Sequence, residues 1–156
     1  MVYLTNRCVG LWKSTKDGSK RSWKKIKNKE KEEAEDEKLT FTQIQELAEK
    51  ALNYIPGRVA FYAPEVGVNY GKITIRNQKT RWGSCSSKGN LIFNCLLMLT
   101  PPEVIDSVVV HELCHRKEMN HSKWFYDEVY RVYPEYDKWN KWLKENGPGL
   151  MNRMVR

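Results

Sequence analysis

Apolar residues recur at helical spacing in a stretch that begins near residue 40. Thr40 and Gln43 have the spacing of a capping box, in which each side chain bonds the other residue's backbone amide at the start of a helix. The apolar positions that follow repeat every three or four residues: Ile44, Leu47, Ala48, Ala51 and Leu52. Because Pro56 and Gly57 both disfavour a helix interior, the pattern predicts a helix over Phe41–Tyr54.

Three segments of strand length come next, separated by turns that contain glycine or polar residues. They are Arg58–Tyr62, Lys72–Arg76 and Asn90–Met98. Ser86–Asn90 favours a hairpin turn, and Thr80–Ser86 favours a loop in which Gly83 permits close approach of the backbone. The segments predict a small, mostly antiparallel sheet.

A second helical pattern begins after the last predicted strand. Thr100 and Glu103 have capping-box spacing, and Pro101 suits the first helical position. Four apolar residues supply one face of this helix: Val104, Ile105, Val108 and Val109. Two further helices are predicted over Ser122–Tyr133 and Pro134–Asn146, so the whole pattern indicates an α+β fold with one helix before the sheet and three after it.

All three histidines of the chain lie in the second helical pattern or just after it. His111 and His115 enclose Glu112 in the sequence His-Glu-x-x-His. Side chains four residues apart project from one helix face, so two imidazoles can bind one metal ion. The glutamate is offset from the metal axis and can hold a water molecule as a general base. The pattern therefore predicts a metal-site helix, against which the small sheet packs.

The sequence offers two alternatives for a third metal ligand. His121 lies six residues past His115 and reaches the ion only if the helix ends first, and Asn120 can adopt the left-handed conformation that ends a helix. The rival is a carboxylate on the following helix, from Asp127 or Glu128. We favour His121, because a chain that turns at Asn120 reaches the ion sooner.

Charge and composition limit the setting in which this site acts. The chain has 27 basic and 19 acidic side chains, a net charge of +8, which residues 1–38 and 39–156 share equally, so no single basic patch indicates a nucleic-acid surface. We expect residues 1–38 to form a charged extension, 39–150 a domain and 151–156 a tail. No leader-like stretch begins the sequence and no apolar run could span a bilayer, so we expect a cytoplasmic protein without a membrane partner.

The stretch Arg81–Phe125, which contains the metal motif, resembles the YgjP-like zinc metallopeptidase domain, a relative of the SprT and WSS type peptidases. The resemblance covers about Leu39–Gly147, and its most specific parts are Arg81–Ser86, Asn94 and His111–Phe125. It implies one catalytic base, Glu112, and three zinc ligands: His111, His115 and His121.

These features predict a zinc-dependent hydrolase, a metallopeptidase that acts on a peptide or protein. Two alternatives stay open. The first is metal-dependent hydrolysis of nucleotide phosphoanhydrides, with Lys79, Arg81 and Lys88 holding phosphates, which keeps a nucleotide or nucleic acid among the partners. The second is a noncatalytic zinc-binding module, against which the presence of Glu112 argues, because a structural site needs no base.

We expect further substrate contacts around the metal. Arg81 can place a guanidinium near the cleft to bind a carboxylate or phosphate, and Asn94, within the resemblance, is a second candidate contact. Three residues are alternative candidates for stabilising an oxyanion: Arg116, Tyr126 and Tyr130. A peptide is expected to lie antiparallel to an exposed strand near Asn90–Met98, bonded through its backbone.

Overall fold

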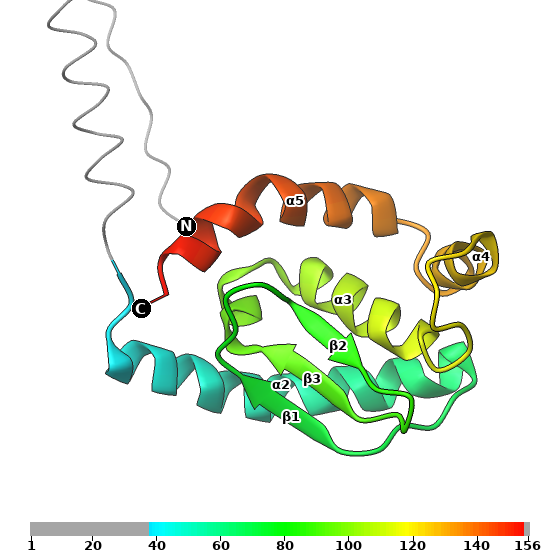
Figure 1. The fold of residues 1–156 in the computed structure, drawn as a ribbon, viewed down its shortest axis with the longest axis horizontal. Helices are drawn as coiled ribbons and strands as arrows, with labels where there is room; N and C mark the ends of the chain where they lie inside the picture. Colours follow the sequence, from blue (N-terminus) through cyan, green and yellow to red (C-terminus); the bar gives the residue numbers. More distant parts are fainter. Residues whose placement is uncertain (1–37, 155–156) are drawn as a thin grey trace, which may run out of the picture. The chain divides into compact units, whose positions relative to one another are not determined.

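The structure is a computed structural model that describes residues 38–154 of the chain. Within this part, one long helix precedes three short strands, and further helices follow them (Figure 1). The α+β class predicted from the sequence is confirmed. The extension expected over residues 1–38 lies outside the described residues except for Lys38.

Helix α2 (Phe41–Val66) is longer than the sequence pattern predicted. The Thr40–Gln43 capping box is present at its start, and Gly67 ends it in the left-handed conformation with a φ of 80°. The predicted stop at Pro56 and Gly57 is wrong, and so is the predicted strand over Arg58–Tyr62. Apolar residues continue on one buried face past the proline, and their packing outweighs the hydrogen bond that proline removes. That face consists of Leu47, Ala51, Ile55, Val59, Tyr62, Ala63 and Val66.

Two residues of this extra helical length hold the metal-site helix in place. Arg58 donates to both carboxylate oxygens of Asp106, at 2.7 and 2.8 Å, and the Tyr62 hydroxyl donates to the same carboxylate at 3.1 Å. A bidentate guanidinium–carboxylate pair fixes orientation as well as distance. The register between α2 and the metal-site helix is therefore set by a charged contact one and a half turns before the metal motif.

The three strands form a mixed sheet in the order β1-β3-β2. Strand β1 (Ile73–Arg76) pairs with β3 (Leu91–Asn94) in parallel, and β2 (Gly83–Cys85) pairs with β3 antiparallel. The predicted hairpin turn joins β2 to β3: the Ser86 amide donates to the Asn90 carbonyl at 2.9 Å, and Gly89 has a φ of 84°. Strand β3 is the central strand, so both of its edges are occupied.

The segment predicted as one strand over Asn90–Met98 changes conformation half-way. After β3, the Asn94 side chain accepts a hydrogen bond from the Leu96 amide and starts a short 3-10 helix, η1 (Cys95–Leu99). A short buried apolar run does not distinguish strand from helix by periodicity, which explains the wrong prediction. The Thr100 hydroxyl donates to the Leu97 carbonyl and so finishes η1, and the capping box predicted for Thr100 and Glu103 is absent.

The metal-site helix α3 (Pro102–Cys114) lies in the middle of the packed region, in contact with α2, β2 and the two helices that follow it (Figure 1). Most of its residues are buried: Val104, Ile105, Ser107, Val108, Val109, Val110, Glu112, Leu113 and Cys114. The burial of α3 means that the His-Glu-x-x-His motif at its end belongs to a helix of the core.

Helices α4 (Lys123–Val132) and α5 (Tyr136–Asn152) complete the described part of the chain. Ser122 caps α4 as its sequence position predicts, accepting a hydrogen bond from the Phe125 amide. Helix α5 continues through Pro148 past its predicted end, and the buried Met154 packs with Leu39, so the packed region extends beyond residue 150. None of the described helices combines the length and the apolar character needed to cross a membrane.

Candidate metal centre

The histidine ligands predicted from the sequence come from the end of α3 and from the turn that follows it. His111 lies in the last turn of α3, and His115 is its C-terminal cap. The helix ends here rather than at Asn120, which corrects the predicted position of the break. Backbone bonds shift to a three-residue spacing, with the Arg116 amide donating to Leu113, and the chain then turns back so that His121 precedes the cap of α4.

The three imidazoles converge through their Nε2 atoms. The His111 Nε2 lies 3.2 Å from that of His115 and 3.1 Å from that of His121. Ligands placed tetrahedrally around an ion, with metal–nitrogen bonds of about 2.0–2.1 Å, lie about 3.3 Å from one another. The two distances from His111 are close to this value, and all three ligand atoms lie within 4.8 Å of one another, so the cluster could hold one metal ion.

Hydrogen bonds on the far side of the rings determine where the lone pairs point. The Nδ1 of His115 lies 3.1 Å from the Glu118 carbonyl, which can only accept, so Nδ1 carries the proton and Nε2 keeps its lone pair. The Nδ1 of His111 pairs with the Tyr136 hydroxyl at 2.8 Å. Burial and the two neighbouring histidines lower the pKa of His111 to about 3, so its ring is neutral. Neutral rings whose lone pairs face one another favour a cation between them.

A single aromatic side chain supports all three rings. Phe125, fully buried on α4, has its ring centroid 4.8 Å from His111, 4.5 Å from His115 and 5.0 Å from His121. Ser122 caps the start of α4 and so fixes the position of the Phe125 ring relative to the three histidines. The positions of the three imidazoles thus depend on packing from α4 as well as on the turn after α3.

The rival carboxylates on α4 are engaged elsewhere. Asp127 accepts from Lys123 at 2.7 Å, and Glu128 accepts from both Arg131 and Lys117, at 2.5 and 2.8 Å. The hydrogen bond from Arg131, followed by the contact with Lys117, lowers the pKa of Glu128 to about 2. Of the two alternatives for a third ligand, the structure brings His121 to the cluster and leaves Asp127 and Glu128 in ion pairs.

Glu112 lies next to the histidines, against the backbone of β2. A Cβ atom added to Gly83 would lie 2.7 Å from Oε1 of Glu112, so the close backbone approach expected at Gly83 is confirmed. Glu112 is 6% exposed, and burial raises the pKa of its carboxyl to about 8, against a smaller lowering by Arg81. The carboxyl lines a pocket of about 220 Å³ together with His111, Arg81 and Tyr136. A group with this pKa can both take and give a proton near neutral pH.

The remaining candidate residues are divided between the pocket and the scaffold. Arg81 lines the pocket, and the ring of Tyr126 lies 6.2 Å from that of His121. Arg116 points to the loop after α2 and the β2–β3 turn, where it donates to Asn69 and to the Ser87 carbonyl. The hydroxyl of Tyr130 donates to Asp137 at 2.9 Å.

Asn94 is fully buried, and the polar atoms of its side chain are occupied by the protein itself. Its Nδ2 donates to the carbonyls of Gln78 and Arg81, at 2.7 and 2.9 Å, and its Oδ1 accepts from the Leu96 amide. An amide with these partners holds the loop before β2. This position does not suit the substrate contact that we expected of Asn94.

The family whose model matches this chain is described as YgjP-like, metallopeptidase domain, and the match spans residues 5–146. The chain belongs to the YgjP-like metallopeptidase family. This confirms the resemblance seen in the sequence and extends it toward the N-terminus. A search of curated proteins gave no match.

Two solved structures share the fold of this YgjP-like protein. The metallopeptidase zymogen abylysin of Pyrococcus abyssi superposes with a TM-score of 0.54 and 22% identity, covering 65% of this chain and 99% of that one. The metallopeptidase zymogen jannalysin of Methanocaldococcus jannaschii gives 0.53 and 22%, covering 59% and 95%. Membership of this family makes the chain a metallopeptidase-like hydrolase. The metallopeptidase class implies that the substrate is a peptide or a protein.

Tyr136 is the site residue that the sequence analysis missed. Its ring lines the pocket, and its hydroxyl is the partner of His111 Nδ1. No short motif contains it, because it lies 25 residues beyond His111 at the first position of α5. Only the packing of α5 against α3 brings the two together.

Replacing Tyr136 by Phe should weaken metal binding without removing it. The change deletes only the hydroxyl that orients His111, and loss of such a partner typically lowers metal affinity about 10- to 100-fold. Competition with a chromophoric chelator measures the effect. Tyr130→Phe, which deletes a hydroxyl bonded to Asp137, is the matched control and should leave the affinity unchanged. Equal affinities in the two variants would show that Tyr136 does not orient His111.

Replacing Glu112 by Gln should stabilise the metal-free protein increasingly as pH rises. The pKa of Glu112 rises from an ordinary 4.5 to about 8 on folding. Between pH 4.5 and pH 8 the folded state therefore keeps the proton that the unfolded state has lost, so the stability of the wild type falls as pH rises through this range. Gln removes this loss, which is at most about 5 kcal/mol for a shift of this size. Thermal melts of chelator-treated protein from pH 5 to pH 9 should show the gap between variant and wild type widening. Glu103→Gln, at an exposed position of the same helix, is the control for the change from carboxylate to amide, and a gap for Glu112→Gln that does not change with pH would contradict the raised pKa.

Proposed function

We propose that this protein is a zinc-dependent peptidase in which Glu112 is the general base and three histidines hold the ion: His111, His115 and His121. The convergence of their Nε2 atoms beside a buried carboxylate carries the proposal. Three imidazole nitrogens with one open position are the donor set of catalytic zinc sites. The neutral ring of His111 and the hydrogen-bonded Nδ1 atoms of His111 and His115 fit such an ion, because no proton has to leave His111 before it binds.

The chain's own groups can carry the proton transfers of peptide hydrolysis. When bound, the ion supplies Lewis-acid chemistry, lowering the pKa of water toward about 7 and polarising a carbonyl. Glu112 faces the pocket and can take the proton of the attacking water and deliver it to the leaving amine. Arg81 lines the same pocket and can bind a carboxylate or the developing oxyanion, as can the hydroxyl of Tyr126 from the α4 side.

Strand β2 supplies an edge along which a peptide can lie. Pairing with the expected segment at Asn90–Met98 is ruled out, because β3 is the central strand. The residues that flank β2, Trp82 and Ser86, make backbone hydrogen bonds to the β3 side, and bonded positions alternate along an antiparallel pair. Gly83 and Cys85 therefore direct their backbone N–H and C=O groups to the open edge. A peptide paired with Gly83 passes beside Glu112.

Zinc content and peptide hydrolysis in a Glu112→Gln variant test the proposal directly. Gln keeps the size of the side chain but cannot accept the proton, so zinc should stay at one ion per chain while hydrolysis falls by about 10² to 10⁴. Elemental analysis and cleavage of a peptide library measure the two. The double variant His111→Ala, His115→Ala should lose both zinc and hydrolysis.

Two outcomes would contradict this proposal. Full zinc occupancy in the double histidine variant would place the ion elsewhere. Hydrolysis within a few-fold of wild type in Glu112→Gln would mean that another group is the base.

Replacing Gly83 by Ala should impair hydrolysis while sparing the metal. The added Cβ would lie 2.7 Å from Oε1 and 2.9 Å from Cγ of Glu112, so the carboxyl or β2 has to move. We expect hydrolysis of the same peptide library to fall at least about 10-fold, with zinc still bound, because misplacing a reacting group has effects of that size. Gly57→Ala is the control, since nothing lies within 4 Å of its Cβ position. Unchanged activity in Gly83→Ala would show that the base tolerates displacement.

A further inference from the structure

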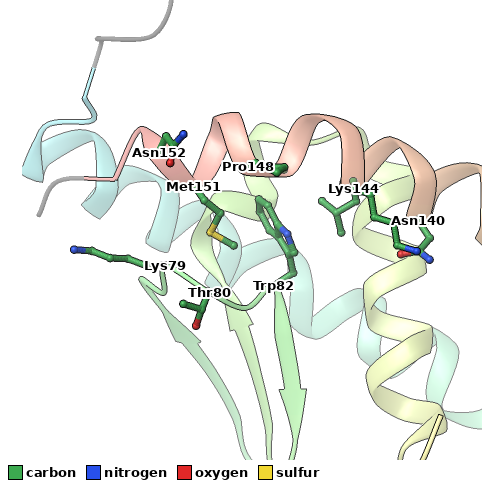
Figure 2. A pocket seen from close by; sticks show the side chains of 10 residues that line it. Lys79, Thr80, Trp82, Asn140, Lys144, Pro148, Met151 and Asn152 are labelled. Atoms are coloured by element: carbon green, nitrogen blue, oxygen red, sulfur yellow. The ribbon is translucent and has the colours of Figure 1, made fainter.

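A second pocket lies beside the metal pocket, between the loop before β2 and the later turns of α5 (Figure 2). It has a volume of about 550 Å³. Trp82, Asn140 and Leu143 line both pockets, so the two adjoin. We call it the α5 groove and define it by Lys79, Thr80, Trp82, Lys144, Pro148 and Met151.

The walls of the α5 groove are held in position by buried contacts. The Asn94 side chain donates to the Gln78 and Arg81 carbonyls and so fixes the loop that carries Lys79 and Trp82. On the other wall, a Cβ added to Gly147 would lie 3.0 Å from the Trp82 ring, so α5 and the indole are in direct contact. The groove is therefore formed before any ligand arrives, which lowers the entropic cost of binding.

The groove combines apolar walls with a cationic rim. Trp82, Pro148 and Met151 supply the apolar surface, and the exposed Lys79 and Lys144 flank it (Figure 2). No Asp or Glu lines the groove, and among the described residues neither lysine has an ion pair. Unpaired cations beside an apolar surface suit a chain that carries apolar side chains and carboxylates.

The direction of a bound peptide decides which part of it meets the groove. A peptide antiparallel to β2 runs from Cys85 toward Gly83, and beyond Gly83 it continues along Trp82 toward Lys79. Gly83 lies beside Glu112, so the residues that meet the groove are those after the cleaved bond. Lys79 lies four positions before Gly83 along a bent segment, and an extended chain covers about 3.3–3.6 Å per residue, so the rim lies within about four residues after that bond.

We propose that the α5 groove binds the part of a peptide substrate that follows the cleaved bond, and that Lys79 and Lys144 select acidic side chains there. The inference rests on the proposed function, because it takes the peptide's path from pairing with β2. It adds a substrate class: peptides with Asp or Glu a few residues after an apolar stretch at the cleaved bond.

Cleavage of a peptide library of known sequences by the zinc-loaded full chain tests the selection. Mass spectrometry identifies the cleaved bonds, and we expect Asp and Glu to be enriched roughly 10-fold at these positions, less so at high salt. Lys79→Gln, Lys144→Gln should abolish the enrichment, so that acidic peptides are cleaved no faster than their neutral counterparts. Lys50→Gln, Lys88→Gln removes the same charge outside both pockets and should keep the enrichment.

Three results would overturn the inference: no acidic enrichment in wild type, equal enrichment in the groove variant, or cleavage that needs a free C-terminal carboxylate and disappears on amidation. A binding measurement separates it from failure of the proposed function. The probe is a capped peptide with two leucines and then two glutamates, compared with its glutamine counterpart on zinc-loaded Glu112→Gln protein. If the library is not cleaved at all, the peptidase proposal fails, and the groove then stands only if the glutamate peptide binds tighter and loses that advantage in Lys79→Gln, Lys144→Gln.

Discussion

The burial of α3 is the constraint on which the rest of the structure depends. Its last turn has to carry a carboxylate and two imidazoles, yet Val109, Val110 and Leu113 of the same turns are fully buried. A core helix can present polar groups only where neighbouring elements leave room for them. The backbone of β2 makes that room at Gly83, and the first turn of α5 does so with the Tyr136 hydroxyl. The sheet and the helices are thus arranged around the polar C-terminal end of α3, whose remaining length is mostly buried among apolar residues.

The histidine cluster could be predicted because its three residues lie within eleven positions of one another in the sequence. Spacing places His111 and His115 on one face, and a ligand at His121 needs only a break in the chain, which the structure supplies. The position of that break was not predictable. Arg116, just past the end of α3, bonds to Asn69 and to the Ser87 carbonyl, and partners so far away in sequence leave no mark on a periodic pattern. Tyr136 was missed for the same reason.

The errors in the predicted fold come from weighing local preference above packing. Pro56 is a poor helix residue, but the buried face of α2 runs through it without interruption. The run after Asn94 is apolar enough for a strand, yet a single side-chain bond to the Leu96 amide turns it into η1. Strand β2 has the sequence Gly-Ser-Cys, which carries no alternation, and it exists because β3 offers it an edge. For α2 and β2 the deciding contact is made with a residue outside the segment, and for η1 it is a side-chain hydrogen bond within it.

Helix α5 begins at Tyr136, the hydrogen-bond partner of His111, and continues to the rim of the α5 groove. Eight residues separate Tyr136 from Lys144, and a rise of about 1.5 Å per residue makes that distance about 12 Å. The rise per residue of a helix is fixed, so α5 sets the distance between Tyr136 and Lys144. An extended substrate covers the same distance in about four residues. Inserting or deleting one helical turn between Tyr136 and Lys144 would change this distance and leave the residues of α3 unchanged. If the α5 groove binds the substrate as proposed, such a change would alter the spacing between the cleaved bond and the acidic side chain that the two lysines bind.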